Sequence, residues 1–171
     1  MSLSRDFAAF VANLRYENLP PAVVDRAKGV ILQGLTSALV AHDMQPSHQA
    51  LALMQQEEAG GGGLATALCS GAKLTKAGAA FVNSEMLLAG GKWDTFRMLT
   101  HPGTAILPAA LVAAEIAGCS GQHLLTAIAA AYEVMERMAA EFIPTVMSRG
   151  FHAGPVFGIF GAAVAAAKVE N

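Results

Sequence analysis

Charged side chains are scarce in this sequence. Of its 171 residues, 14% are Asp, Glu, Lys or Arg and 54% are hydrophobic, whereas a typical soluble domain has about a quarter charged residues. So few charged residues can hardly cover the surface of a compact monomer. We therefore expect exposed apolar surface at a subunit or domain interface. The net charge of −2 provides no basic surface, and we predict no nucleic-acid partner.

The sequence also lacks a long apolar run, a secretion signal and a paired set of cysteines. Its most apolar stretches, residues 104–117 and 154–167, are rich in Ala and Gly and shorter than the roughly 20 residues that a membrane-spanning helix needs. No basic segment followed by an apolar run occurs at the N-terminus. Cys69 and Cys119 have no metal-ligand or redox spacing. These absences predict a cytoplasmic protein with reduced thiols and no membrane partner.

Apolar residues at helical spacing predict an all-α fold, a bundle of helices. An amphipathic stripe covers residues 7–14, with Ser4 as a possible cap, and Pro20-Pro21 begins a long helix that reaches Ala41. Further helices are predicted over residues 46–58, 75–88, 104–116, 122–140 and 155–168. Gly118 and Ser120 are expected to separate two of these helices, and Pro144 to break the helix that follows.

The segments between the helices differ in character. The glycine run at residues 60–63 is expected to be a flexible connector, because it lacks the setting and the Lys-Ser/Thr ending of a phosphate loop. Residues 64–70 fit either a strand or an extended crossing. Residues 89–103 combine Gly, Lys, Trp, Asp, Arg, His and Pro, and loops of such mixed chemistry often carry function. Because the last apolar helix runs almost into the chain end, the sequence reads as cut short.

Short motifs occur in a fixed order along nearly the whole chain. They are Leu19-Pro20 before a long helix, Ala-Ala-Phe-Val-Asn at 79–83, His101-Pro-Gly, Ala114-Glu115, Ser120-Gly121, Tyr132-Glu133 with Arg137, and Gly150-Phe-His152 before residues 157–163. In this order and at these distances they resemble the MmgE/PrpD family, the 2-methylcitrate dehydratase family.

The resemblance implies part of a metal-independent enzyme of two domains, a large helical one and a smaller α+β one, with no cofactor. Known members dehydrate 2-methylcitrate, decarboxylate cis-aconitate or epimerise iminodisuccinate, so the implied substrate class is a small polycarboxylate. In these relatives the active site lies between the domains, and the second domain supplies basic residues. Residues 1–171 are therefore expected to form a single helical domain, truncated before the second domain.

The loop before His101 matches the family pattern only in part. That pattern reads His-x-x-Asp-aromatic-Asp-Asp-Thr, followed a few residues later by His-Pro, and Asp94, Thr95 and His101 match it. The family's first His, first Asp and middle Asp are absent, and those positions hold Leu88, Gly91 and Trp93. Loss of the first Asp removes an expected acid–base group, so we predict that the chain alone is inactive or severely impaired.

Roles for the remaining residues follow from the chemistry that the family performs. Removing a proton from carbon beside a carboxylate builds up negative charge, which cations or hydrogen-bond donors must stabilise. The candidate catalytic residues are His101 and Asp94. Histidine suits proton transfer because its unperturbed pKa lies near neutrality, and the Asp94 carboxylate can fix the tautomer of that ring. The candidate substrate-binding residues are Thr95, His152, Arg149 and Lys92.

Each candidate also has a purely structural interpretation. His101 can bond a loop carbonyl, Asp94 can cap the loop, and His152 can close a turn. A second hypothesis is therefore a helical oligomerisation or interaction module without catalysis. In either case the surplus of apolar residues predicts a homo-oligomer, at least a dimer, with residues 104–116 and 155–168 supplying buried or interfacial surface. We also expect residues 91–104 and 149–154 to meet at one end of the bundle, where an anion such as citrate binds.

Overall fold

The computed structural model describes residues 2–58, 63–97 and 100–170 of the chain. The helices in these residues are α1 (Leu3–Asn13), η1 (Tyr16–Asn18, a 3-10 helix), α2 (Pro21–Ala41), α3 (Gln45–Glu57), α4 (Lys76–Ala89), α5 (Gly103–Ala117), α6 (Gly121–Ala139), α7 (Ile143–Ser148) and α8 (Ala153–Val169). Two short strands, β1 (Ala65–Thr66) and β2 (Lys73–Leu74), form an antiparallel hairpin. The predicted all-α fold class is confirmed.

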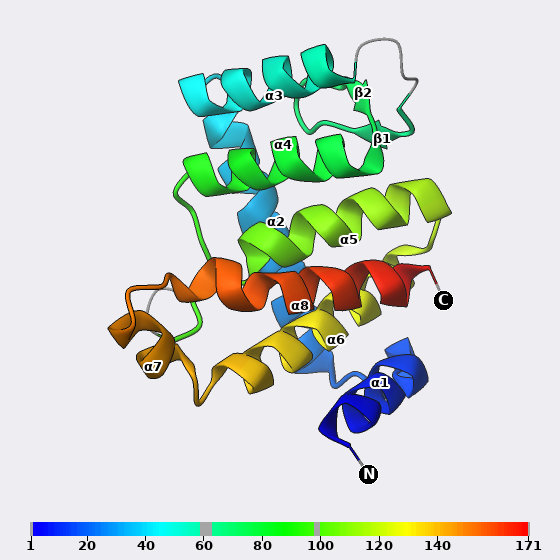
Figure 1. Cartoon of the computed structure of the whole chain (residues 1–171). Coiled ribbons are helices and arrows are strands. Elements are labelled where there is room, and N and C mark those ends of the chain that lie inside the picture. The colour runs from blue at the N-terminus through cyan, green and yellow to red at the C-terminus, as the bar shows by residue number, and fades with distance from the viewer. Residues whose placement is uncertain (1, 59–62, 98–99, 171) are drawn as a thin grey trace.

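Helix α5 lies at the centre of the bundle (Figure 1). It packs between α4 and α8, while α6 packs against α8, and α2 crosses behind α4, α5 and α6. Helix α1 lies at the edge and has no buried residue. Because α5 and α8 run in the same direction, their N-termini lie at the same end of the bundle (Figure 1).

The core lies between α4, α5, α6 and α8. Its largest fully buried side chains include Met86, Ile106, Ile128, Met135 and Ile143. Met86, Ile106, Ile128 and Met135 come from helices predicted by their apolar spacing, so those helical stripes do face one another. Ile143 comes from α7, which was not predicted. The apolar stretch at residues 104–116 is mostly buried in this core, whereas α8 buries one face and exposes the other.

Polar residues set the helix ends. The Thr75 hydroxyl accepts a hydrogen bond from Gly78 N at 3.1 Å at the start of α4, and the Ser120 hydroxyl accepts one from His123 N at 3.2 Å at the start of α6. Gly118 ends α5 in the left-handed conformation, with φ +61°. The predicted boundary between these two helices is therefore confirmed.

Several local features differ from the sequence-based expectation. Pro144 does not simply break a helix, because it lies in the first turn of the additional helix α7, where the missing N–H costs nothing. Residues 64–70 contain the strand β1. Its partner β2 was not predicted, because a strand of two residues is too short to show a periodic signal. Ser2, not Ser4, is at the N-cap position of α1. Of the predicted glycine connector, residues 60–62 lie outside the described residues.

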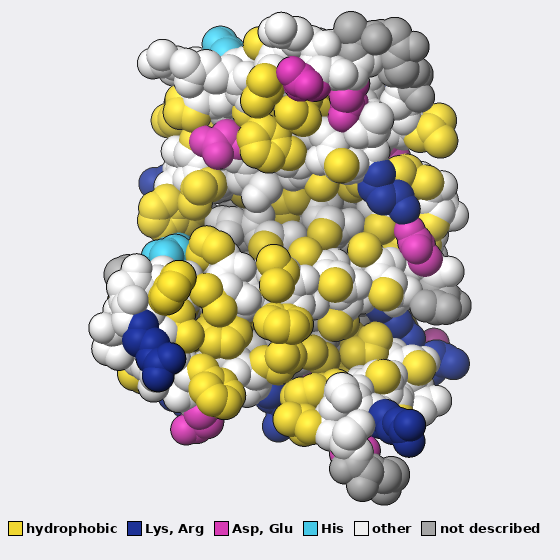
Figure 2. Space-filling view, in the orientation of Figure 1, with side chains coloured by type: hydrophobic (Ala, Val, Ile, Leu, Met, Phe, Trp, Pro, Cys, Tyr) yellow, Lys and Arg dark blue, Asp and Glu magenta, His cyan; other side chains and the backbone are white. Residues whose placement is uncertain are grey.

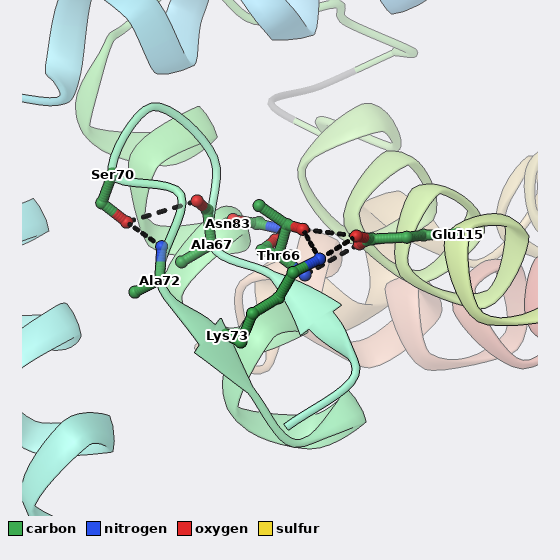
Figure 3. Close-up of polar contacts among 7 residues, drawn as sticks. All are labelled: Thr66, Ala67, Ser70, Ala72, Lys73, Asn83 and Glu115. Atoms are coloured by element: carbon green, nitrogen blue, oxygen red, sulfur yellow. Dashed lines mark hydrogen bonds and ion pairs between the residues drawn. The ribbon is translucent and has the colours of Figure 1, made fainter. Parts of the chain in front are cut away.

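Glu115, near the end of α5, ties the hairpin to the bundle (Figure 3). Its carboxylate accepts hydrogen bonds from Thr66 N at 2.8 Å, from the Thr66 hydroxyl, and from Lys73 Nζ at 2.7 Å. Asn83, buried in α4, donates to Thr66 O at 3.0 Å and accepts from Leu68 N at 2.7 Å. Hydrogen bonds from Lys73 and Thr66 lower the pKa of Glu115 to about 2. The cluster therefore holds a charged carboxylate at neutral pH.

Candidate functional site

The Asp94 carboxylate holds the N-terminus of α5. Both of its oxygens accept from Gly103 N, at 3.1 and 3.0 Å, and Oδ2 also accepts from the Tyr132 hydroxyl at 2.7 Å. A negative charge at this position is favourable, because free N–H groups and the helix dipole make a helix N-terminus positive. Asp94 therefore connects the loop to both α5 and α6.

Gly103 permits this arrangement by having no side chain. A Cβ atom at residue 103 would lie 2.7 Å from Asp94 Oδ1 and 2.9 Å from the Tyr132 hydroxyl oxygen. Real Cβ atoms essentially never lie this close to another atom, so a side chain at residue 103 would force the Asp94 carboxylate or the Tyr132 hydroxyl to move. The His-Pro-Gly motif thus has a steric reason for its third residue.

The His101 ring is held in one tautomer by the loop itself. Its Nδ1 lies 2.8 Å from the backbone carbonyl oxygen of Asp94 and 3.3 Å from the Thr95 hydroxyl oxygen. A carbonyl can only accept, so Nδ1 must carry the hydrogen and, in the neutral ring, Nε2 must be the unprotonated nitrogen. Within the described residues, Nε2 has no hydrogen-bond partner.

This geometry corrects the expected role of Asp94. The sequence suggested that the Asp94 carboxylate fixes the tautomer of His101, but in the structure the Asp94 backbone carbonyl takes that place. The carboxylate is engaged with Gly103 and Tyr132 instead, because the N-terminus of α5 attracts it. Trp93 lies beside the histidine, with ring centroids 4.7 Å apart, and its Nε1 donates to Leu88 O at 2.8 Å. Trp93 therefore supports the ring.

Two residues of α6, Tyr132 and Glu136, complete the cluster, and neither was predicted from sequence to have a role. Burial, with the adjacent Asp94 carboxylate, raises the pKa of Tyr132 far above its usual range, so its hydroxyl stays protonated and remains a donor. Burial and the charges of Asp94 and Glu133 raise the pKa of Glu136 to about 7. The only hint in the sequence is the spacing of Tyr132 and Glu136, which puts both on one face of a helix.

Gly91 and Lys92 lie where the loop leaves α4. Gly91 has the left-handed φ of +68°, and a Cβ there would meet nothing within 4 Å, so crowding does not explain the absence of the family's Asp at this position. Lys92 donates its backbone N–H to the Ser37 hydroxyl at 3.2 Å. Its exposed side chain lines an open hollow together with Gln33 and Trp93.

Arg149 and His152 lie in the turn between α7 and α8. Both are exposed, and neither side chain forms a hydrogen bond or an ion pair with the described residues. His152 is at the N-cap position of α8 but its ring does not cap the helix. The structure therefore does not bring Arg149 or His152 into direct polar contact with Asp94, Thr95 or His101.

The loop after α4 and the turn between α7 and α8, which were expected to meet, nevertheless lie at the same end of the bundle (Figure 1). Arg97 of the loop donates from Nη1 to Ala140 O, just after α6, at 3.0 Å. The first turn of α5 packs closely against the second turn of α8, since a Cβ on Gly158 would lie 3.0 Å from that of Ala105. The N-termini of both helices therefore point toward the region that the loop and the α7–α8 turn border.

Two kinds of feature are absent from the part of the chain that the structure describes. It contains no group of three or more His, Cys, Asp and Glu side chains that could hold a metal ion. Nor does any helix among residues 2–58, 63–97 and 100–170 combine the length and apolar character needed to cross a bilayer.

The bundle and its loop define a helical domain with a histidine site at the N-terminus of its central helix. Residues 5–171 match the MmgE/PrpD N-terminal domain, and the chain belongs to the MmgE/PrpD family. It is 27% identical over 178 residues to the cis-aconitate decarboxylase-like protein oryM of Aspergillus oryzae, in an alignment that covers 98% of this chain and 36% of that relative. The chain thus spans about a third of the length of this relative. No solved structure matches it.

Proposed function

We propose that the end of the bundle at His101 binds a small polycarboxylate. The observation that carries the proposal is the His101 ring, whose Nδ1 is occupied by a carbonyl while Nε2 is left for a ligand. When protonated, Nε2 donates a hydrogen bond to a carboxylate, and the Thr95 hydroxyl beside the ring adds a second polar group.

The ligand class follows from charge and from the relative. The fungal protein is named for cis-aconitate, a tricarboxylate, and Lys92 and Arg149 are exposed cations at this end of the bundle. Arg149 is the better carboxylate ligand of the two, because its planar guanidinium binds both oxygens at once. His152 is the remaining candidate contact, from the N-cap position just before α8.

We further propose that the chain alone does not turn over such acids, although it is related to lyases and epimerases that do. Glycine replaces the family's first Asp at position 91, and the Asp94 carboxylate is already bonded to Gly103 and Tyr132. Loss of an acid–base group typically lowers the rate by about a hundredfold to ten-thousandfold. Dehydration or decarboxylation of any such acid by the purified chain, abolished in His101→Ala, would contradict this proposal.

NMR titration of the purified chain with citrate tests the binding site. We expect shifts in residues 91–104 and 149–154 and a dissociation constant of about 1 mM or weaker, because exposed ion pairs contribute only about 1 kcal/mol or less each. His101→Ala should weaken binding at least about threefold. His48→Ala is the matched control, because His48 is exposed on α3, and it should bind like the wild type. Absent shifts, or shifts spread over the whole surface, would refute the site.

A second candidate function is self-association with another copy of this chain. Hydrophobic side chains gather over α8 and α7 (Figure 2). The large hydrophobic residues exposed in and beside these helices are Phe142, Phe151, Ile159 and Phe160, and Ile159 is 64% exposed. Contiguous apolar surface of this kind is typical of an interface. We expect a dimer at micromolar concentration by light scattering, and Ile159→Asp should dissociate it. Leu32→Asp, at a site 67% exposed on α2, should remain dimeric. A monomeric wild type would refute this function.

A further inference from the structure

We propose that Tyr132 is a positioning residue for His101 and acts on it through Asp94. The inference rests on the proposed function, in which the His101 ring contacts the ligand. Tyr132 itself lies on α6, behind the loop, and its hydroxyl bonds to the Asp94 side chain rather than to the ring.

Asp94 makes the connection because both of its polar ends are in use. Its carboxylate accepts from the Tyr132 hydroxyl at 2.7 Å and from Gly103 N, while its backbone carbonyl oxygen lies 2.8 Å from His101 Nδ1. Fixing the side chain restricts rotation about the backbone bonds of the same residue. The direction in which the carbonyl points, and with it the tautomer of His101, therefore depends on the bonds that the carboxylate keeps.

The tyrosine hydroxyl is the part of Tyr132 that matters for this connection. Tyr132 is partly buried, and among the described residues its hydroxyl bonds to the Asp94 carboxylate. A phenylalanine would keep the packing of the ring but leave the carboxylate with Gly103 N as its remaining donor. A half-buried carboxylate with too few donors moves toward water, and here that movement takes the carbonyl away from Nδ1.

A purely structural role for Tyr132 predicts something different. If the tyrosine only anchors the N-terminus of α5, its loss lowers stability but leaves the histidine tautomer unchanged. Ring 15N spectra of the full chain separate these cases, because they report directly which nitrogen of each histidine carries the hydrogen. His123 is an internal reference, since its Nε2 lies 2.9 Å from the Lys168 carbonyl oxygen and must carry the hydrogen there.

The experiment compares wild type, Tyr132→Phe and Thr126→Val at a pH where the histidines are neutral, with no citrate present. Thr126 is a matched control, because it is also buried in α6 and its hydroxyl donates to Gln122 O at 2.9 Å, away from Asp94. We expect His101 to be the Nδ1–H tautomer in wild type and in Thr126→Val. In Tyr132→Phe the Nε2–H form of His101 should rise several-fold, with His123 unchanged.

Asp94→Asn keeps the experiment decisive if Tyr132→Phe does not fold. The asparagine retains the backbone carbonyl and one side-chain oxygen, but its NH2 group cannot accept from a second donor. It should shift His101 in the same direction. A folded Tyr132→Phe or Asp94→Asn chain whose His101 stays in the wild-type tautomer overturns the proposal.

The citrate titration separates this inference from the proposed function. With both correct, Tyr132→Phe binds citrate about threefold to tenfold more weakly than Thr126→Val does, within the range expected for one lost polar contact. If the wild type gives no citrate shifts at all, the proposed function fails, whereas the tautomer comparison still decides whether Tyr132 positions the ring.

Discussion

A carboxylate lies at each end of α5, and the two carboxylates have different hydrogen-bond partners. At the C-terminal end, Glu115 bonds to a lysine and to two donors of Thr66 (Figure 3). At the N-terminal end, the Asp94 carboxylate bonds to the Tyr132 hydroxyl and to Gly103 N, and Glu136 lies close enough for the two charges to repel. The first cluster includes a cation, while the second contains neutral donors and an additional acid.

The presence or absence of a cation gives the clusters opposite electrostatic behaviour. Lys73 and Thr66 lower the pKa of Glu115 to about 2, so this carboxylate is charged at all ordinary pH values. Burial and the charge of Asp94 raise the pKa of Glu136 to about 7. A carboxylate that a cation and hydrogen bonds keep charged serves structure here, whereas a carboxyl group whose pKa is raised by burial and by neighbouring like charges is a pattern common in functional sites.

Removing the space at Gly103 should break the N-terminal cluster most severely. In Gly103→Ala the new Cβ would lie 2.7 Å from Asp94 Oδ1 and 2.9 Å from the Tyr132 oxygen. We expect the free energy of unfolding, measured by urea denaturation, to fall by about 2 kcal/mol. Gly121→Ala, in the first turn of α6 where a Cβ meets nothing within 4 Å, should stay within about 0.5 kcal/mol of wild type or gain stability. Equal stability of the two variants would contradict this explanation.

Helices α1 to α6 and α8 were predictable from sequence because they have long apolar stripes and several have a recognisable end, whereas η1 and α7 are too short to show such a stripe. Thr75, Gly118 and Ser120 act locally, within three or four residues, so their roles can be inferred from neighbouring letters. The bonds of Asp94 could not be inferred in this way. Its carboxylate partner Tyr132 is 38 residues away, and only packing of α6 against the loop brings them together. Asp94, Thr95 and His101 were correctly placed in one loop, but the pairing of carbonyl with ring and carboxylate with tyrosine depends on that packing.

Changing pH should separate the two clusters, and Glu136→Gln should sharpen the difference. Between pH 4.5 and about 7 the native Glu136 holds a proton that the unfolded chain has released, so its contribution to stability is lost as pH rises through that window. The full shift corresponds to about 3 kcal/mol, which solvent screening of this half-buried group reduces to about 1 kcal/mol. Glu136→Gln should therefore be about 1 kcal/mol more stable than wild type at pH 8.

The groups that face Glu136 are Asp94 and Glu133, and Glu133 pairs with Arg137. The free energy of unfolding, measured with urea from pH 4.5 to 8, should decline in the wild type but not in Glu136→Gln. Glu141→Gln, at an exposed position just beyond α6, is the control and should follow the wild type. If the curves of Glu136→Gln and wild type run parallel, Glu136 does not hold a proton at neutral pH.

The smallest expected effect concerns the cation of the other cluster. Lys73 Nζ bonds to Glu115 at 2.7 Å and to the Thr66 hydroxyl at 2.6 Å, whereas among the described residues Lys76 Nζ bonds to Glu170 alone, at 2.6 Å. Because both lysines are about half exposed, each pair contributes about 1 kcal/mol or less. Lys73→Met should nevertheless cost more than Lys76→Met, since it removes two bonds from a network that joins β1 to α5.

Acid unfolding makes this comparison decisive. The contribution of Glu115 is present above pH 4.5 and lost as pH falls through about 2. Without Lys73 the pKa of Glu115 moves back toward its ordinary value, so Lys73→Met should lose the contribution of this carboxylate at a higher pH than Lys76→Met does. Urea unfolding between pH 5 and 2 measures the difference directly. If the free energies of unfolding of the two variants fall at the same pH, Thr66 alone holds the Glu115 carboxylate. The lysine is then not what distinguishes the two ends of α5.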